Sequence, residues 1–267
     1  MNKSHDRFLR IVNQKLKYFR YSKRTIEIYL HYIEKFLVTV NEYPQHLTGN
    51  HFQTYLDNYN FSSGSQQNQI INAIKFLYEK VLDRKYGKVR FDRPKTELFL
   101  PDIIDETYLK ECICKISNLK HKCIISLAYS DALRVSDIVN LKITDIDSKR
   151  MQIKVVKGKG NKDAYVPLTQ NVLDLLRIYY KQYRPKEYLF EGQKSPQYSA
   201  NSCNKIVKKY IGEKYHFHSL RHSSLTHLMD KGVNQRLIQK LARHQNGSTT
   251  ERYTHVSKQS LENLPLY

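Results

Sequence analysis

The chain has 267 residues, which is enough for one large domain or two modest ones, each with a hydrophobic core. Its 45 lysines and arginines face only 25 aspartates and glutamates, so the formal charge is +20, and the excess runs through both halves. This balance is typical of proteins that neutralise phosphates, although charge alone leaves a ribosomal or membrane-surface protein open. The sequence shows no apolar signal core and no apolar run of membrane-spanning length, which argues against a secreted or membrane-spanning protein.

The cysteines form no CxxC pair and no dense framework, which indicates reduced thiols in a cytosolic protein. We therefore expect a cytoplasmic location. There are four of them: Cys112, Cys114, Cys123 and Cys203.

Residues 1–88 are predicted to form a small helical domain. Ser22 is placed to cap a helix whose apolar residues, from Ile26 to Val40, recur at helical spacing. A short helix is expected near residues 51–56, and a third after residues 63–65 with an apolar stripe that runs on to Val81. The basic cluster of residues 15–24, taken alone, is typical of a solvated surface.

Residues 86–101 contain two prolines, several basic residues and no helical period, so we expect a linker at 89–101 that can lie along a DNA backbone. The second domain, residues 102–267, begins with helical periodicity from residue 105 to 130. A β-hairpin follows, in which alternating residues from Met151 to Val155 precede a turn at 158–161 and a return strand. Helical patterns then continue to the end, so the chain is predicted to be mainly α with a small antiparallel sheet.

Two segments of the second domain present basic residues at turns. Arg134 lies between two predicted helices, where it can be held rigidly and point outward, and Ser136 is a plausible N-cap. Lys159 lies at the tip of the hairpin between two glycines, but the spacing of a phosphate-binding P-loop is missing. Each residue alone is typical of a solvated surface side chain.

Two later segments carry histidines, a second arginine and a tyrosine. His218 and Arg221 are three residues apart at the start of a helix, so they can share one face. His218 and His222 have the spacing of metal ligands, but no carboxylate or cysteine completes a zinc set. Residues 246–247 are expected to end a helix, and Ser248 with Glu251 to cap the next one, which contains Tyr253. Because the chain has 21 tyrosines, any single one is ordinarily a core or surface ring.

Taken in order, these residues resemble the active-site set of the tyrosine recombinases, the lambda-integrase-like and Xer-like enzymes. The resemblance covers nearly the whole chain, and its N-terminal part looks like the family's helical core-binding domain with YSKRTIEIYLHYIEKF as opening helix. The matching strings are LRVSD, KGKGNKDAYVPL, HSLRHSSLTHLMDKG and STTERYTHV. The matching catalytic residues are Arg134, Lys159, His218, Arg221, His244 and Tyr253.

The resemblance implies that the chain cleaves and rejoins DNA through a 3′-phosphotyrosine intermediate, with no metal, ATP or other cofactor. Tyr253 would be the nucleophile, and because a tyrosine hydroxyl has a pKa of about 10, a cationic pocket is needed to favour its phenolate. Arg134 and Arg221 would clamp the non-bridging phosphate oxygens, since guanidiniums bind phosphate bidentately. The remaining roles would be a general acid at Lys159, proton transfer at His218, a phosphate hydrogen bond at His244 and side-chain orientation by Asp137.

The family's architecture implies a two-domain, C-shaped clamp around double-stranded DNA. Members act as homotetramers on paired sites, and we expect a monomer or dimer off DNA. The segment after Tyr253 could dock on a neighbouring subunit or cover its own domain. We expect DNA contacts from a set of basic residues: Lys15, Lys17, Arg20, Lys23, Arg24, Lys88, Arg90, Arg93, Lys95 and Lys162.

The chain departs from the family pattern at three points. It has Ala132 in place of glycine two residues before Arg134, and Asp137 where glutamate is usual. Arg243 replaces the glycine that ordinarily precedes the histidine of the Leu-Gly-His motif, so its side chain could contact phosphate or displace His244. This substitution motivates one rival, a DNA-binding protein that has lost catalysis.

Two further rivals are a type IB topoisomerase, which the short chain disfavours, and a basic RNA-binding protein. Within the recombinases, the sequence does not separate a mobile-element or phage integrase from a chromosome-dimer resolvase. The start of the core-binding helix near Ser22 leaves no room for a separate arm-binding domain. Base contacts cannot be deduced from a single sequence, so the recognised DNA is not predicted.

Overall fold

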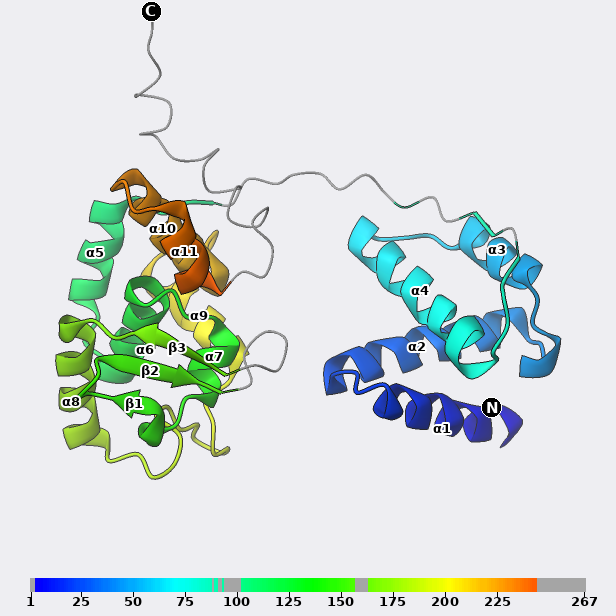
Figure 1. The fold of residues 1–267 in the computed structure, drawn as a ribbon, viewed down its shortest axis with the longest axis horizontal. Helices are drawn as coiled ribbons and strands as arrows, with labels where there is room; N and C mark the ends of the chain where they lie inside the picture. Colours follow the sequence, from blue (N-terminus) through cyan, green and yellow to red (C-terminus); the bar gives the residue numbers. More distant parts are fainter. Residues whose placement is uncertain (1–2, 88, 91–92, 94–101, 157–162, 244–267) are drawn as a thin grey trace, which may run out of the picture. The chain divides into compact units, whose positions relative to one another are not determined.

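The computed structural model describes residues 3–87, 89–90, 93, 102–156 and 163–243. The chain folds as two compact units that divide between residues 98 and 99. Both are built mainly from helices, and the second also holds a three-stranded antiparallel sheet, as predicted (Figure 1). Within the described ranges, no helix has the length and apolarity that crossing a membrane requires.

The N-terminal unit consists of helices, as expected, but its first helix was not predicted. The helix α1 precedes the one capped by Ser22, so the assignment of YSKRTIEIYLHYIEKF as the opening helix is wrong. Val12 and Leu16 of α1 are fully buried four residues apart, which is the spacing of one helix face. The elements are α1 (Lys3–Tyr18), α2 (Lys23–Val40), a 3₁₀ turn (Pro44–His46), α3 (Gly49–Asn58), α4 (Gly64–Phe76) and a π turn (Leu77–Val81).

The predicted cap at Ser22 and the predicted apolar stripes of this unit are confirmed. The Ser22 side chain accepts a hydrogen bond of 3.1 Å from the backbone N–H of Thr25. Ser63 caps α4 in the same way, so this helix begins at Gly64, inside the segment 63–65 that was expected to precede it. Helix α2 lies against α1 and α4, and its residues Ile33 and Phe36 are fully buried in the core of the unit (Figure 1). The local capping signals and the apolar periodicity therefore agree with the packing.

In the second unit, one face of the sheet packs on a core that it shares with the helices. The helical stretch expected over residues 105–130 is two helices, because Asn118 caps a new one after a break at residues 116–118. The short strand β1 was not predicted. The elements are α5 (Glu106–Lys115), α6 (Leu119–Ser130), α7 (Val135–Asn140), a 3₁₀ turn (Ile143–Asp145), β1 (Ile146–Asp147), β2 (Gln152–Val155), β3 (Ala164–Pro167), α8 (Gln170–Tyr183), α9 (Ala200–Tyr210), α10 (Phe217–Asp230) and α11 (Gln235–Ala242).

The sheet has the order β1-β2-β3, with β2 antiparallel to both neighbours. Ile153 is opposite Val166 and both are buried, whereas Lys154 is opposite Tyr165 on the other face. This alternation confirms the predicted hairpin, since one face packs on the core and the other meets solvent. The predicted turn at 158–161 lies outside the described residues.

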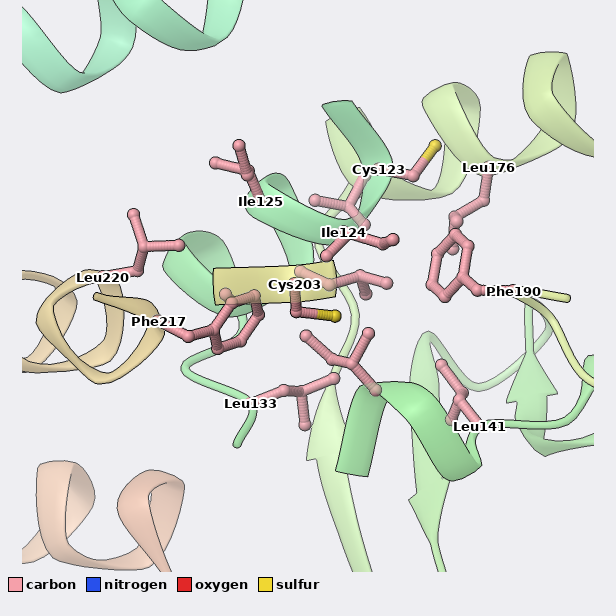
Figure 2. Packing of buried hydrophobic residues seen from close by; sticks show 14 of the residues in the cluster. Cys123, Ile124, Ile125, Leu133, Leu141, Leu176, Phe190, Cys203, Phe217 and Leu220 are labelled. Atoms are coloured by element: carbon pink, nitrogen blue, oxygen red, sulfur yellow. The ribbon is translucent and has the colours of Figure 1, made fainter. Parts of the chain in front are cut away.

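Helix α6 runs through the centre of the second core. Figure 2 shows Ile124 and Ile125 of this helix among side chains from several other elements, including Phe190 and Phe217. All residues from 123 to 128 are buried, as expected of a central helix with apolar residues on every side. Burial raises the pKa of the Cys123 and Cys203 thiols to about 12, so these two cysteines act as packing groups.

Candidate active site

Arg134 is the N-cap of α7, so the expectation that Ser136 caps this helix is wrong. The Asp137 carboxylate accepts a hydrogen bond of 3.0 Å from the backbone N–H of Arg134. Since Asp137 is the third residue of the helix, this bond closes the first turn and leaves Ser136 inside it. The chain direction at Arg134 is therefore set by the helix end that follows it.

The guanidinium of Arg134 is directed at the C-terminal end of α11. Its Nη2 donates to the carbonyl oxygens of Ala242 and Arg243, at 2.9 and 3.3 Å. The prediction that this side chain is rigidly held agrees with these bonds. It is partly buried rather than pointing freely outward, because α11 packs over the α7 N-terminus.

Arg221 reaches the same place from α10. Its side chain is almost fully buried, with 3% of the residue exposed, and its two terminal nitrogens donate to the carbonyl oxygens of Ala132 and Ala242. Arg134 and Arg221 therefore meet at one acceptor, the carbonyl oxygen of Ala242. Two guanidiniums that share an oxygen in this way are close enough to hold one phosphate group together.

His218 lies one turn before Arg221 on α10 and at the surface of the unit. Partial burial of the ring, followed by the positive charges of Arg221, His216 and Arg134, lowers the pKa of His218 below its ordinary value. The ring is therefore neutral at neutral pH and can accept a proton. Both arginines contribute to this shift, so His218 belongs to the same electrostatic site, as the shared helix face predicted.

The alternative metal site at His218 and His222 gains no further ligand from the described residues. The two rings lie one turn apart on α10, with centroids separated by 6.0 Å. In the ranges that the structure describes, no group of three histidine, cysteine or carboxylate side chains is arranged to hold a metal ion.

Arg243 ends α11, so the expectation that residues 246–247 end this helix is wrong. It adopts the left-handed conformation at φ 51°, and its N–H closes the last turn on Gln239 and Lys240. Its guanidinium is paired with the Asp137 carboxylate. The sequence left open whether the Arg243 side chain contacts phosphate or displaces His244. In the structure Asp137 holds this side chain, and any effect on His244 lies outside the described residues.

Ala132, which also departs from the family pattern, has a left-handed backbone conformation as well. Ala132 has φ 48°, and its carbonyl oxygen accepts from Arg221. Glycine adopts this conformation without a steric cost. The two glycines that the family pattern places at Ala132 and Arg243 are therefore explained by backbone geometry, and this chain holds both turns with L side chains.

Several predicted site residues are not placed by the structure. Among the catalytic residues, Lys159, His244 and Tyr253 lie outside the described ranges, as do the capping pair Ser248 and Glu251. The same holds for three of the basic residues expected to contact DNA: Lys88, Lys95 and Lys162.

The five basic residues between positions 15 and 24 gather where α1 ends and α2 begins. All five are exposed, and none forms an ion pair with a described residue. This corner is therefore an uncompensated positive surface, as a phosphate-binding face requires. They are Lys15, Lys17, Arg20, Lys23 and Arg24.

Two arginines of the expected linker form hydrogen bonds with α3 and α4. The Arg93 guanidinium donates to the side-chain oxygens of Asn68 and Asn72 on α4, at 2.6 and 2.9 Å. The backbone N–H of Arg90 donates to Gln53 at 2.8 Å. Both arginines are exposed, so they remain accessible to phosphate.

Sequence reasoning missed two titratable residues that lie a few positions before His218 and Arg134 in the chain. His216 lies 6.5 Å from His218 between ring centroids, and the HxH pattern was the signal for it. Asp131 ends α6 three residues before Arg134; burial raises its pKa to about 7, while the N–H of Thr169, 3.4 Å away, partly offsets this. No local pattern reveals Asp131, because its burial comes from tertiary packing.

Comparison with known proteins identifies the family. Residues 105–260 match the phage integrase family, and residues 8–88 match the N-terminal SAM-like domain of phage integrases. The chain is 33% identical to the tyrosine recombinase XerA of Pyrococcus horikoshii over 90% of its own length and 86% of that protein. It is 31% identical to a putative integrase/recombinase of Sinorhizobium fredii, over 77% of this chain and 85% of that one.

Among solved structures, the chain has the fold of the XerH site-specific recombinase bound to palindromic difH substrate in a post-cleavage complex. The TM-score is 0.70 at 21% identity, over 89% of this chain and 78% of that one. The chain therefore belongs to the phage integrase family, the class of the tyrosine recombinases. It is a site-specific DNA recombinase, as the sequence analysis predicted.

Proposed function

We propose that this recombinase breaks and rejoins DNA through a covalent bond to Tyr253, with Arg134 and Arg221 as the phosphate clamp. The observation that carries the proposal is that both guanidiniums donate to the same oxygen, the carbonyl of Ala242. A phosphate that replaced this carbonyl would meet two fixed cations, which stabilise the charge that develops on its non-bridging oxygens. Binding DNA would then require the end of α11 to give up these bonds.

The reaction exchanges one phosphodiester for another. The Tyr253 hydroxyl loses its proton and its oxygen bonds to phosphorus, while the bond from phosphorus to the 5′-oxygen breaks. The product is a phosphotyrosine on the 3′ side and a free 5′-hydroxyl. Because the bond energy is kept in the phosphotyrosine, a 5′-hydroxyl can attack it and restore the DNA without ATP.

Two proton transfers accompany cleavage. His218 is suited to take the proton from Tyr253, since the lowered pKa keeps its ring neutral and basic. Lys159, on the hairpin after β2, would give a proton to the leaving 5′-oxygen. His244 would hydrogen-bond the phosphate, and Asp137 holds the backbone at Arg134. This scheme takes its positive charge from side chains and involves no metal or nucleotide cofactor.

We assign residues 1–88 to DNA binding, 89–101 to a linker and 102–267 to catalysis. The exposed basic corner between α1 and α2 supports the first assignment. The proposed DNA-bound form is a C-shaped clamp, assembled as a homotetramer on paired sites from monomers or dimers. The enzyme would act in the cytoplasm on double-stranded DNA that carries or borders a mobile element, or alternatively on chromosome dimers.

The test is to trap the covalent intermediate on labelled, nicked DNA from the region that flanks the protein's own gene. We expect a protein–DNA band on a denaturing gel for the wild type and none for Tyr253→Phe. A native gel with the same DNA serves as the binding control. Tight binding without a covalent band would indicate a DNA-binding protein that has lost catalysis.

A further inference from the structure

Arg243 is held in a conformation that a residue with a side chain seldom adopts. Its backbone has φ 51° and forms the left-handed end of α11, with its N–H 3.0 Å from the carbonyl oxygen of Lys240. This geometry carries the side chain away from the helix and toward α7. The side chain is 11% exposed, and that of its partner Asp137 is 5% exposed.

Arg134 and Arg243 are linked in both directions. The Arg134 guanidinium donates to the backbone carbonyl of Arg243, at 3.3 Å. In return, one carboxylate oxygen of Asp137 accepts from the Arg243 side chain and from the Arg134 backbone N–H. The Asp137–Arg243 pair therefore holds Arg134 by its backbone, in a bond that a bound phosphate would not replace, whereas the bond at the guanidinium is one that phosphate would replace.

Stability alone does not account for Arg243. Two of its nitrogens, Nε and Nη1, are buried and form no hydrogen bond with the described part of the chain. Buried unsatisfied donors and a left-handed arginine both work against folding, and a buried ion pair gives little net stability in return. The glycine of the family pattern would avoid all three.

We infer that Arg243 is a positioning residue, which acts through Asp137 to hold Arg134 in place for attack on the phosphate. This inference rests on the proposed function of Arg134. A glycine at this position has no side chain to pair with Asp137, so the link belongs to this chain and its Asp137–Arg243 pair. Both members must be present for the link to form.

The test is a double-mutant cycle of single-turnover cleavage on nicked DNA, with Arg243→Gly, Asp137→Asn and the double variant. Each single change should slow cleavage by about 10- to 100-fold, because a small displacement of a catalytic group has effects of this size. The double variant should be within about threefold of the slower single variant, since both changes remove one link. The affinity for DNA should change by no more than about threefold in any of them.

Two companion variants sharpen the result. Arg243→Lys keeps a cation near Asp137 and should recover part of the lost rate. Lys240→Ala removes a positive charge from an exposed position on the same helix and should leave the rate within about threefold of the wild type. A faster Arg243→Gly enzyme, or independent multiplicative losses in the cycle, would overturn the inference.

A second readout does not depend on activity. Hydrogen exchange of the peptide over residues 132–140 reports the protection of the Arg134 backbone N–H, which donates a hydrogen bond to Asp137. Arg243→Gly should speed exchange there and leave α9 unchanged, and equal exchange in both proteins would contradict the link. If the wild type forms no Tyr253-dependent band, the proposed function fails, whereas the exchange measurement still decides on the link.

Discussion

At the scale of single residues, the central feature is the meeting of Arg134 and Arg221 at one backbone oxygen. The sequence order of the catalytic set predicted that these arginines share a site, and their hydrogen bonds to Ala242 agree. The bonds themselves could not be predicted, since the acceptor is a carbonyl that any residue at position 242 would provide. Resemblance identifies side chains, while the backbone groups that hold them depend on tertiary structure.

His218 gives a prediction about pH. Its pKa lies below the ordinary value, so the ring is neutral and able to take the proton of Tyr253 down to a pH below about 6.5. On the acidic limb of the pH–rate profile, the single-turnover cleavage rate should be level at neutral pH and fall as the pH drops through the lowered pKa of His218.

The control for this prediction is His218→Asn. It should lower the plateau about 100-fold, as expected for loss of a general base, and should abolish the acidic limb. If the limb persists in His218→Asn, another group controls the acidic side of the profile, and the assigned role of His218 is wrong.

At the scale of elements, signals that lie within a few residues were reliable. The cap at Ser22 and the alternation of β2 and β3 are confirmed, because each is decided by neighbouring residues. Signals that depend on competing local choices were not. The N-cap of α7 is Arg134 and not Ser136, because the Asp137 side chain bonds to the backbone N–H of Arg134 and so starts the helix two residues earlier. Helix α11 ends at Arg243 rather than at the glycine of residue 247.

The junction between α6 and α8 yields a second prediction. Asp131 ends α6 and accepts a hydrogen bond from the backbone N–H of Thr169, the N-cap of α8. Burial raises the pKa of Asp131 to about 7, so ionisation of this carboxyl group opposes folding. A raised pKa gives a stability contribution that is complete below the unfolded value and is lost as the pH rises through the folded value. For Asp131, that loss occurs between about pH 4 and 7.

Asp131→Asn carries no charge at any pH, so its stability should change less over this range. Relative to the wild type, it should gain on the order of 2 kcal/mol between pH 5 and pH 8, measured as the free energy of unfolding in urea. If the difference in free energy of unfolding between the two proteins is the same at pH 5 and pH 8, folding does not change the pKa of Asp131.

At the scale of the whole molecule, the formal charge of +20 is the most general property that the sequence reveals. It predicted a nucleic-acid partner, and membership in the recombinase family agrees. The two-unit organisation was also visible, because the composition changes at the prolines near residue 94. The target sequence was not, since the chain's base contacts depend on docked geometry.

The exposed basic corner between α1 and α2 makes the charge argument testable. Lys23→Ala with Arg24→Ala should lower the slope of log affinity against log salt concentration by up to about 2, one unit for each phosphate that the variant no longer neutralises. Lys110→Ala with Lys115→Ala is the matched control, because these lysines already pair with Glu106 and Glu111 at 2.8 and 3.7 Å. Equal salt slopes in the two double variants would remove this corner from the DNA interface.

The most direct test of the account is to determine which DNA fragment becomes attached to Tyr253. Nicked DNA is labelled either at the 5′ end or at the 3′ end of the cleaved strand and incubated with the wild type and with Tyr253→Phe. If Tyr253 attacks as proposed, the 5′-labelled fragment is held by the wild-type protein through its 3′ phosphate, while the 3′-labelled fragment leaves with a free 5′-hydroxyl. Attachment to the other fragment, or an equal covalent band in Tyr253→Phe, would contradict it.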